Sequence, residues 1–113
     1  MTDRLPAALE VSALTRQVAA AGGFAMVLAK GNPDSGAILV VIMTNGANSR
    51  LYERMPQADG DRIWHLTKRE DALNPQDLSN YLIRRRAQDD DLWIIELDVP
   101  HGERFIGITV PKD

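Results

Sequence analysis

The sequence has 113 residues, with 13 lysines or arginines against 16 aspartates or glutamates and a formal net charge of −3. Because the two signs are mixed along the chain, no strong field is expected to attract nucleic acid or an anionic membrane. The chain has no cysteine, which excludes disulfides and thiolate metal sites.

The length predicts a single globular domain over residues 1–113, of which residues 1–6 are expected to be frayed. The first residues lack the charged and apolar regions of a signal peptide, and every apolar run is shorter than the roughly 20 residues that span a bilayer. We therefore expect a cytoplasmic protein that does not contact a membrane.

A helix is predicted over residues 7–21, where Val11, Leu14 and Val18 recur at helical spacing. Gly22 and Gly23 follow at once, and one of them suits the left-handed position after a helix. We expect this helix to pack on a sheet through that single apolar stripe.

The next two apolar runs, residues 24–29 and 37–43, flank the polar hexapeptide 31–36. Pro33 can preset the first corner of a turn, and Gly36 can take a positive φ. Neither run alternates polar and apolar residues, as a strand with one wet face should. The pattern predicts a hairpin of two central strands that are covered on both faces.

Asn45 and Gly46 then mark a turn. Residues 50–55 predict a more exposed strand, because Glu53 interrupts the apolar face; Arg50, Tyr52 and Arg54 share the other face. Residues 61–67 alternate and predict a fourth strand. Four consecutive strands with short links favour an antiparallel meander.

A second helix is predicted over residues 74–88, with Asn74 as its N-cap and Pro75 at its first position. Its inward residues are expected to include Leu78, Tyr81 and Leu82. Residues 92–99 predict a fifth strand and 104–110 a possible sixth. The fold class is therefore α+β: an antiparallel meander of five to six strands with two helices packed on it, in the order α-β-β-β-β-α-β-(β).

Three consecutive arginines, residues 84–86, form the basic cluster of the sequence. On a helix they point about 100° apart and cannot form one patch, and the aspartates at 89–91 cancel their charge. Nucleic-acid binding is therefore disfavoured and stays a third hypothesis. Such a surface would use Arg84, Arg86, Lys68 and Arg69.

Glu96 and Asp98 lie two residues apart on a predicted strand, so their carboxylates share a face about 7 Å apart. With His65 or His101 they could form the site of a small metal-dependent or acid/base enzyme. A solvated sheet face has the same pattern. We therefore assign no catalytic or metal-binding residue and expect no cofactor.

Four segments, residues 31–40, 89–97, 11–14 and 20–25, together resemble a small family typical of alphaproteobacteria, domain of unknown function 1491. The resemblance covers about residues 10–99. It implies a single-domain bacterial protein and supplies no activity and no site.

Arg85, Asp91, Trp93 and Glu96 form a hypothetical structural network or partner contact. We expect Arg85 to pair with Asp91 or Glu96 and to lock the second helix onto the fifth strand. Tryptophans are usually core anchors, but Trp64 or Trp93 becomes a partner contact if it is exposed.

The leading functional hypothesis is a cytoplasmic interaction or adaptor module. Its partner is expected to be another protein or a second copy of the chain, as a homodimer. Contact would be made through an exposed sheet edge or an aromatic patch, because uncovered edge strands invite pairing.

Overall fold

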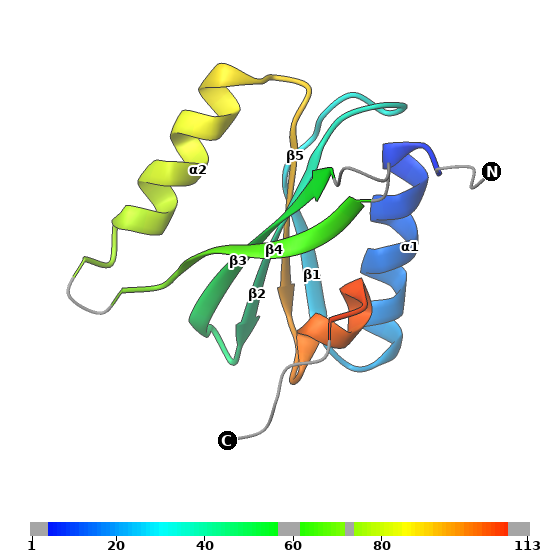
Figure 1. Ribbon diagram of the computed structural model, residues 1–113. Coiled ribbons are helices and arrows are strands. Elements are labelled where there is room, and N and C mark those ends of the chain that lie inside the picture. Colours follow the sequence, from blue (N-terminus) through cyan, green and yellow to red (C-terminus); the bar gives the residue numbers. More distant parts are fainter. Residues whose placement is uncertain (1–4, 57–61, 72–73, 109–113) are drawn as a thin grey trace.

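The computed structural model describes residues 5–56, 62–71 and 74–108, and two helices flank its central sheet (Figure 1). The predicted frayed residues 1–4 and Asp61, the expected start of the fourth strand, lie outside this part. The elements in chain order are α1 (Ala7–Ala20), β1 (Phe24–Ala29), β2 (Ile38–Thr44), β3 (Ala47–Pro56), β4 (Arg62–Arg69), α2 (Asp77–Gln88), β5 (Trp93–Asp98) and the 3-10 helix η1 (Gly102–Ile106).

The sheet has five strands in the order β1-β5-β2-β3-β4. The α+β class and the two helices are confirmed, but the purely antiparallel meander is wrong. β5 pairs parallel with β2 and antiparallel with β1, while β2, β3 and β4 form an antiparallel run. The chain crosses back over one face through α2 before β5 enters the middle of the sheet.

The predicted hairpin of 24–29 with 37–43 is also wrong, because β5 lies between β1 and β2. β2 does occupy the centre, and its residues Ile38–Ile42 are all buried. β1 is instead an edge strand with exposed side chains. β5 carries Glu96 and Asp98 and is less apolar than β1, yet its Ile94, Ile95 and Leu97 are buried on two faces. The apolar content of a run therefore does not decide whether the run takes a central place in the sheet.

Two apolar clusters sandwich the sheet. α1 and η1 cover one face of the sheet, and α2 covers the other (Figure 1). The larger cluster lies under α1 and η1, and the smaller one lies under α2. Buried members of the larger cluster include Val11, Leu14, Val18, Val40, Ile42, Tyr52, Trp93, Ile95 and Leu97. Those of the smaller cluster are Leu39, Val41, Leu51, Leu92 and Ile94. Every residue of α2, which is described along its whole length, keeps some exposure, so α2 is the less firmly packed helix.

Both predicted helices are present, and one boundary of each is shifted. α1 ends one residue before the predicted end, and Gly22 takes the left-handed conformation with φ +85°. α2 begins at Asp77 rather than Asn74, because the amide of Asp77 binds the carbonyl of Asn74 in a turn that precedes the helix. Its predicted inward residues Leu78, Tyr81 and Leu82 pack on the smaller cluster, as expected.

The predicted sixth strand is absent from the described part of residues 104–110, which ends at residue 108; a 3-10 helix, η1, begins just before it. His101 adopts φ +55° and turns the chain, and Gly102 then packs so closely that a Cβ would lie 2.6 Å from Ile42 Cγ2.

The expectation of an exposed third strand is wrong as well, since Leu51, Tyr52 and Glu53 are buried. Among the described residues, no helix is long and apolar enough to cross a membrane.

Candidate functional site

The α1-side face of β3 carries the three side chains that were predicted to share a face. Two of them hold η1 against the sheet through the buried carboxylate of Glu103. Arg50 donates to it from Nε at 2.7 Å and from Nη2 at 3.0 Å, and the Tyr52 hydroxyl donates at 2.9 Å. These three donors satisfy a carboxylate that is 6% exposed.

The pKa values reflect this arrangement. Burial alone would raise the pKa of Glu103, but the hydrogen bonds from Arg50 and Tyr52 hold it below its ordinary value. Burial and the bond to Glu103 together raise the pKa of Tyr52 to about 12. At neutral pH the group is therefore a charged Arg–Glu pair with a neutral tyrosine, which fits a structural connection.

The opposite face of β3 holds α2 in the same way, through Glu53. The Tyr81 hydroxyl donates to Glu53 Oε2 at 2.6 Å, and Arg85 pairs with Glu53 Oε1. Burial would raise the pKa of Glu53, but these bonds lower it. The carboxylate that interrupts the apolar pattern of β3 is therefore the anchor of the second helix.

This geometry corrects the expected partner of Arg85. Its guanidinium contacts Glu53 and Tyr81, not Asp91 or Glu96, so it ties α2 to β3 rather than to β5. β3 lies two strands away from β5, and its Glu53 is the carboxylate within reach of Arg85. The neighbouring Arg86 donates instead to the carbonyl of Leu92 at 2.5 Å.

Trp93 and Asp91 fasten the polar loop 31–36 to the start of β5. Trp93 is 4% exposed, and its Nε1 donates to the carbonyl of Asn32 at 2.8 Å. The amide of Asn32 donates to the carbonyl of Asp91 at 2.9 Å. The expectation of a core tryptophan holds here, while Trp64 is half-buried beside the larger cluster.

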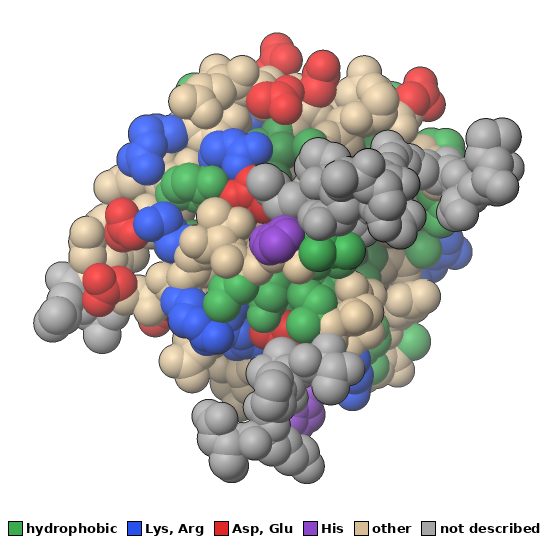
Figure 2. All heavy atoms as spheres, viewed as in Figure 1, with side chains coloured by type: hydrophobic (Ala, Val, Ile, Leu, Met, Phe, Trp, Pro, Cys, Tyr) green, Lys and Arg blue, Asp and Glu red, His purple; other side chains and the backbone are tan. Residues whose placement is uncertain are grey.

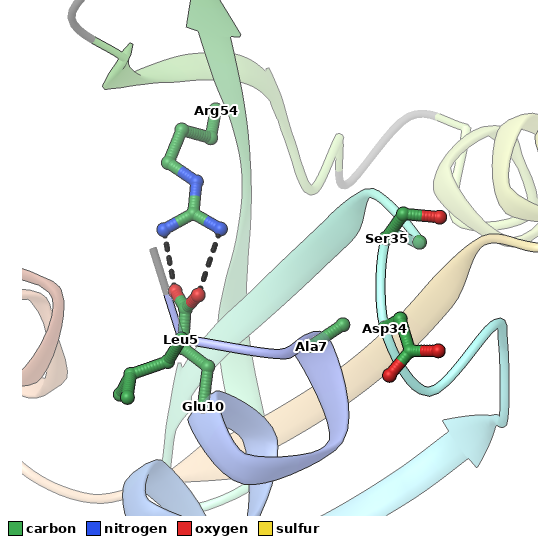
Figure 3. Close-up of a pocket in the computed structure, with 7 residues that line it drawn as sticks. Leu5, Ala7, Glu10, Asp34, Ser35 and Arg54 are labelled. Atoms are coloured by element: carbon green, nitrogen blue, oxygen red, sulfur yellow. Dashed lines mark hydrogen bonds and ion pairs between the residues drawn. The ribbon is translucent and has the colours of Figure 1, made fainter. Parts of the chain in front are cut away.

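The third side chain of this face, Arg54, lies in a pocket between α1, β3 and the loop 34–36, with a volume of about 170 Å³ (Figure 3). Both terminal nitrogens of Arg54 face the carboxylate of Glu10, with Nη2 at 3.0 Å from Oε1. Its Cζ lies 4.9 Å from the centroid of the Trp64 ring. The Nε atom is buried and has no hydrogen-bond partner among the described residues.

The pocket does not have the composition of an active site. The first amides of α1, those of Ala7 and Ala8, already donate to the carbonyls of Asp34 and Pro33 at 3.2 and 2.9 Å. Ser35 Oγ lies 3.4 Å from the side-chain oxygen of Asn32, which is not a base. The described residues around this pocket thus offer neither an activated nucleophile nor unpaired helix amides for an anion.

The residues of the enzyme hypothesis are held apart. Asp98 accepts hydrogen bonds from the amides of Asn45 and Gly46 at 2.8 and 2.9 Å and so caps the turn between β2 and β3. His65 is on β4, three strand positions from Glu96 on β5, which corresponds to roughly 14 Å. His101 takes its left-handed turn before η1. These residues form no common cleft in the described part of the chain.

The basic residues of the nucleic-acid hypothesis are dispersed among structural contacts. Lys68 pairs with Asp77 at 2.7 Å, and Arg84 lies 5.9 Å above the Tyr81 ring. On the face shown in Figure 2, basic, acidic and apolar side chains are interspersed outside the grey atoms. This mixture does not make a continuous cationic surface.

One acidic group has oxygens close enough for a cation. Asp89, Asp90 and Asp91 place one carboxylate oxygen each within 4.8 Å of the others, and all three are exposed. Asp89 Oδ1 accepts the amide of Asp91 at 3.0 Å, which is a turn contact. We assign no metal to it.

The feature that the sequence analysis missed is the edge strand β1. Its exposed side chains are all apolar: Phe24 is 78% exposed, Met26 59%, Leu28 45% and Val27 43%. The opposite edge, β4, carries the charged residues Lys68 and Arg69 beside its exposed apolar residues Ile63 and Leu66. Charged side chains protect sheet edges from pairing, so β4 is protected and β1 is not. The signal that could have revealed this was the uninterrupted apolar run at 92–95, a further candidate for a strand covered on both faces.

The comparisons with known proteins point to one family. A family model described as a protein of unknown function (DUF1491) matches residues 5–107. A crystal structure of a DUF1491 family protein from Caulobacter crescentus CB15 is 29% identical, with TM-score 0.80, and the match covers 96% of this chain and 100% of that one. An NMR structure of a DUF1491 family protein from the same organism is also 29% identical, with TM-score 0.81 and coverages of 98% and 100%.

A third solved structure comes from another bacterium. The solution structure of protein Atu0922 from A. tumefaciens is 29% identical, with TM-score 0.77, and the match covers 97% of this chain and 98% of that one. None of the curated proteins matches the chain. The family expected from residues 10–99 is thus confirmed over a longer stretch.

Proposed function

The chain belongs to the DUF1491 family, a family of unknown function, and we propose that it is a protein-interaction module. The module would bind an extended partner strand along the edge of β1. The observation that carries the proposal is the uncovered apolar edge. Main-chain hydrogen bonds would supply affinity and the alternating side chains selectivity.

The backbone of β1 supports strand addition. One side pairs with β5 in an unbroken antiparallel register from Phe24 to Val27. In the described part of the chain, no strand pairs with its other side. The sequence Phe24–Ala29 has no proline and no charged residue, so nothing in it opposes a further ladder.

The side chains of β1 define what the partner strand should present. Ala25 packs on the core under α1, so Phe24 and Met26 point to the opposite face. There they lie beside Asp98 and Glu96 of β5 in register. The partner strand should therefore place apolar side chains opposite Phe24 and Met26.

A β-bulge limits the length of the site. The register between β1 and β5 shifts between Val27 and Ala29, which leaves Leu28 as the extra residue. A bulge bends its strand and ends regular pairing. The regular edge is thus Phe24–Val27, which favours a short partner segment and reversible binding.

The test uses a defined peptide probe, acetylated Lys-Val-Phe-Val-Phe-Val-Lys amide, titrated into the labelled protein and followed by NMR. We expect amide shifts that concentrate on β1 and slower exchange of its amides. A peptide N-methylated at alternate residues should not bind, because it cannot form the ladder. Shifts that fall on the Arg54 pocket instead, or no shifts, would contradict the proposal.

A matched pair of variants controls for loss of apolar surface. Met26→Lys puts a charge on the edge and should abolish binding. Ile83→Lys changes a residue of similar size on α2, which is 67% exposed, and should bind the probe as the unmodified protein does.

A further inference from the structure

We infer that the strand pairing with β1 is β1 of a second copy of this chain, antiparallel and centred on Ala25, so that two five-stranded sheets join into one. The inference rests on the proposed function and names its partner. Like the proposal, it uses the edge segment Phe24–Val27, whose other side pairs with β5.

Symmetry restricts the registers to a few. Two copies that continue one antiparallel sheet are related by a two-fold axis perpendicular to it, so each residue faces one that points to the same side of the sheet. Side chains alternate between the two sides. Facing residues must therefore have numbers of equal parity, and the axis passes between two copies of the same residue.

The bulge selects among these registers. With the axis at Ala25, Phe24 faces the second copy's Met26 and Met26 faces the second copy's Phe24, all within the regular segment. With the axis at Met26, Phe24 would face Leu28, which the bulge displaces from the ladder. Of these two registers, only the one centred on Ala25 pairs Phe24 and Met26 within the regular edge.

The chosen register is chemically self-complementary. It makes two aromatic–thioether pairs from Phe24 and Met26, a combination that favours cross-strand contact. On the α1 side it brings two alanines together, and Val27 faces Gly23 of the second copy. Small residues on that side leave space for the two α1 helices.

Charge does not oppose the pairing. β1 carries none, and the carboxylates beside it in register, on Glu96 and Asp98, belong to β5 of each copy. The two β5 strands would stand three strand spacings apart, roughly 14 Å. That exceeds the Debye length of about 8 Å at physiological ionic strength.

The exposed side chains of β1 indicate a reversible dimer. From their exposed fractions they would bury on the order of 800 Å² over both copies, below the usual size of a stable interface. We therefore expect a monomer–dimer equilibrium whose dimer fraction rises with protein concentration.

Because the chain has no cysteine, a single introduced cysteine reports on the register. In Ala25→Cys the two thiols would face each other with Cα atoms about 4.5–5.5 Å apart, within disulfide reach. In Met26→Cys they would sit diagonally, outside that reach. Under mild oxidation we expect Ala25→Cys to form covalent dimers at least tenfold faster than Met26→Cys or the control Ile83→Cys.

The inference would be overturned if Met26→Cys crosslinked faster than Ala25→Cys, or if Ala25→Cys and Ile83→Cys crosslinked at equal rates. Because a cysteine variant could fail to fold, sedimentation velocity measures dimerisation separately, on the unmodified protein and on two lysine variants. The unmodified protein and Ile83→Lys should sediment faster as concentration rises, while Met26→Lys stays monomeric. An unmodified protein that stays monomeric at millimolar concentration would refute self-pairing.

The outcomes separate the two claims. If the protein stays monomeric but still binds the peptide probe along β1, the second copy is not the partner and the interaction module stands. If it neither dimerises nor binds the probe, both claims fail.

Discussion

Replacing Tyr52 by phenylalanine separates the polar role of a buried side chain from its packing role. The ring of Tyr52 belongs to the larger cluster, and its hydroxyl donates to Glu103 at 2.9 Å. Phenylalanine keeps the ring and removes one hydrogen bond to a charged acceptor, worth about 1.5–3 kcal/mol. Glu103 retains the two bonds from Arg50. We expect the free energy of unfolding at pH 7 to fall by about 2 kcal/mol.

The same variant should change the alkaline limb of stability. The pKa of Tyr52 is about 12 in the folded protein, against its ordinary value of 10.0. Between these values the folded state binds more protons than the unfolded state, so raising the pH favours unfolding. The contribution of Tyr52 is complete below pH 10, and roughly 2–3 kcal/mol is lost by pH 12. Tyr52→Phe lacks this loss.

Urea unfolding followed by tryptophan fluorescence at pH 7, 9, 10 and 11 tests both effects. The two proteins should differ most at neutral pH and converge as the pH rises. Tyr81→Phe tests the same reasoning at a second site, because Tyr81 also donates to a buried glutamate and has a raised pKa. The reasoning would be refuted if Tyr52→Phe had the same urea midpoint as the unmodified protein at pH 7. It would also be refuted if both proteins lost the same free energy of unfolding between pH 10 and 11.

Three further predictions concern the contacts around the sheet. In Gly36→Ala the new Cβ would lie 2.2 Å from the carbonyl oxygen of Asp91, so thermal unfolding should show a loss of about 3 kcal/mol. Glu53→Gln should speed amide exchange in α2 and leave β2 unchanged, because it weakens the contact with Arg85; equal exchange would contradict this anchor. The lowered pKa values of Glu53 and Glu103 give stability that is present above their ordinary values and lost as the pH falls below them. In the double variant Glu53→Gln and Glu103→Gln, the free energy of unfolding, measured by urea titration, should therefore decrease less as the pH falls.

Local patterns predicted the parts of the fold that local chemistry determines. The spacing of Val11, Leu14 and Val18 predicted α1, because a helix on a sheet needs one apolar stripe. Strand alternation placed Arg50, Tyr52 and Arg54 on one face, and they do share the face under α1. Neither inference needed to know which strands are neighbours.

Strand order and ion-pair partners could not be predicted in the same way. Residues 24–29 and 92–95 are both apolar without interruption, and which run takes the central place depends on long-range packing. The partner of Arg85 followed from that order: the prediction limited the choice to nearby carboxylates, whereas Glu53 lies 32 residues away along the chain. The edge surface was missed for the same reason.

Amide hydrogen exchange of β1, recorded at several protein concentrations, would report whether a further strand pairs with this edge. Alternate amides between Phe24 and Val27 point away from β5, and pairing along the edge would protect them. We predict that their exchange slows as concentration rises and that Met26→Lys abolishes this dependence. If exchange along β1 stays equally fast at every concentration, with and without the peptide probe, no strand pairs with this edge and the proposed binding mode is wrong.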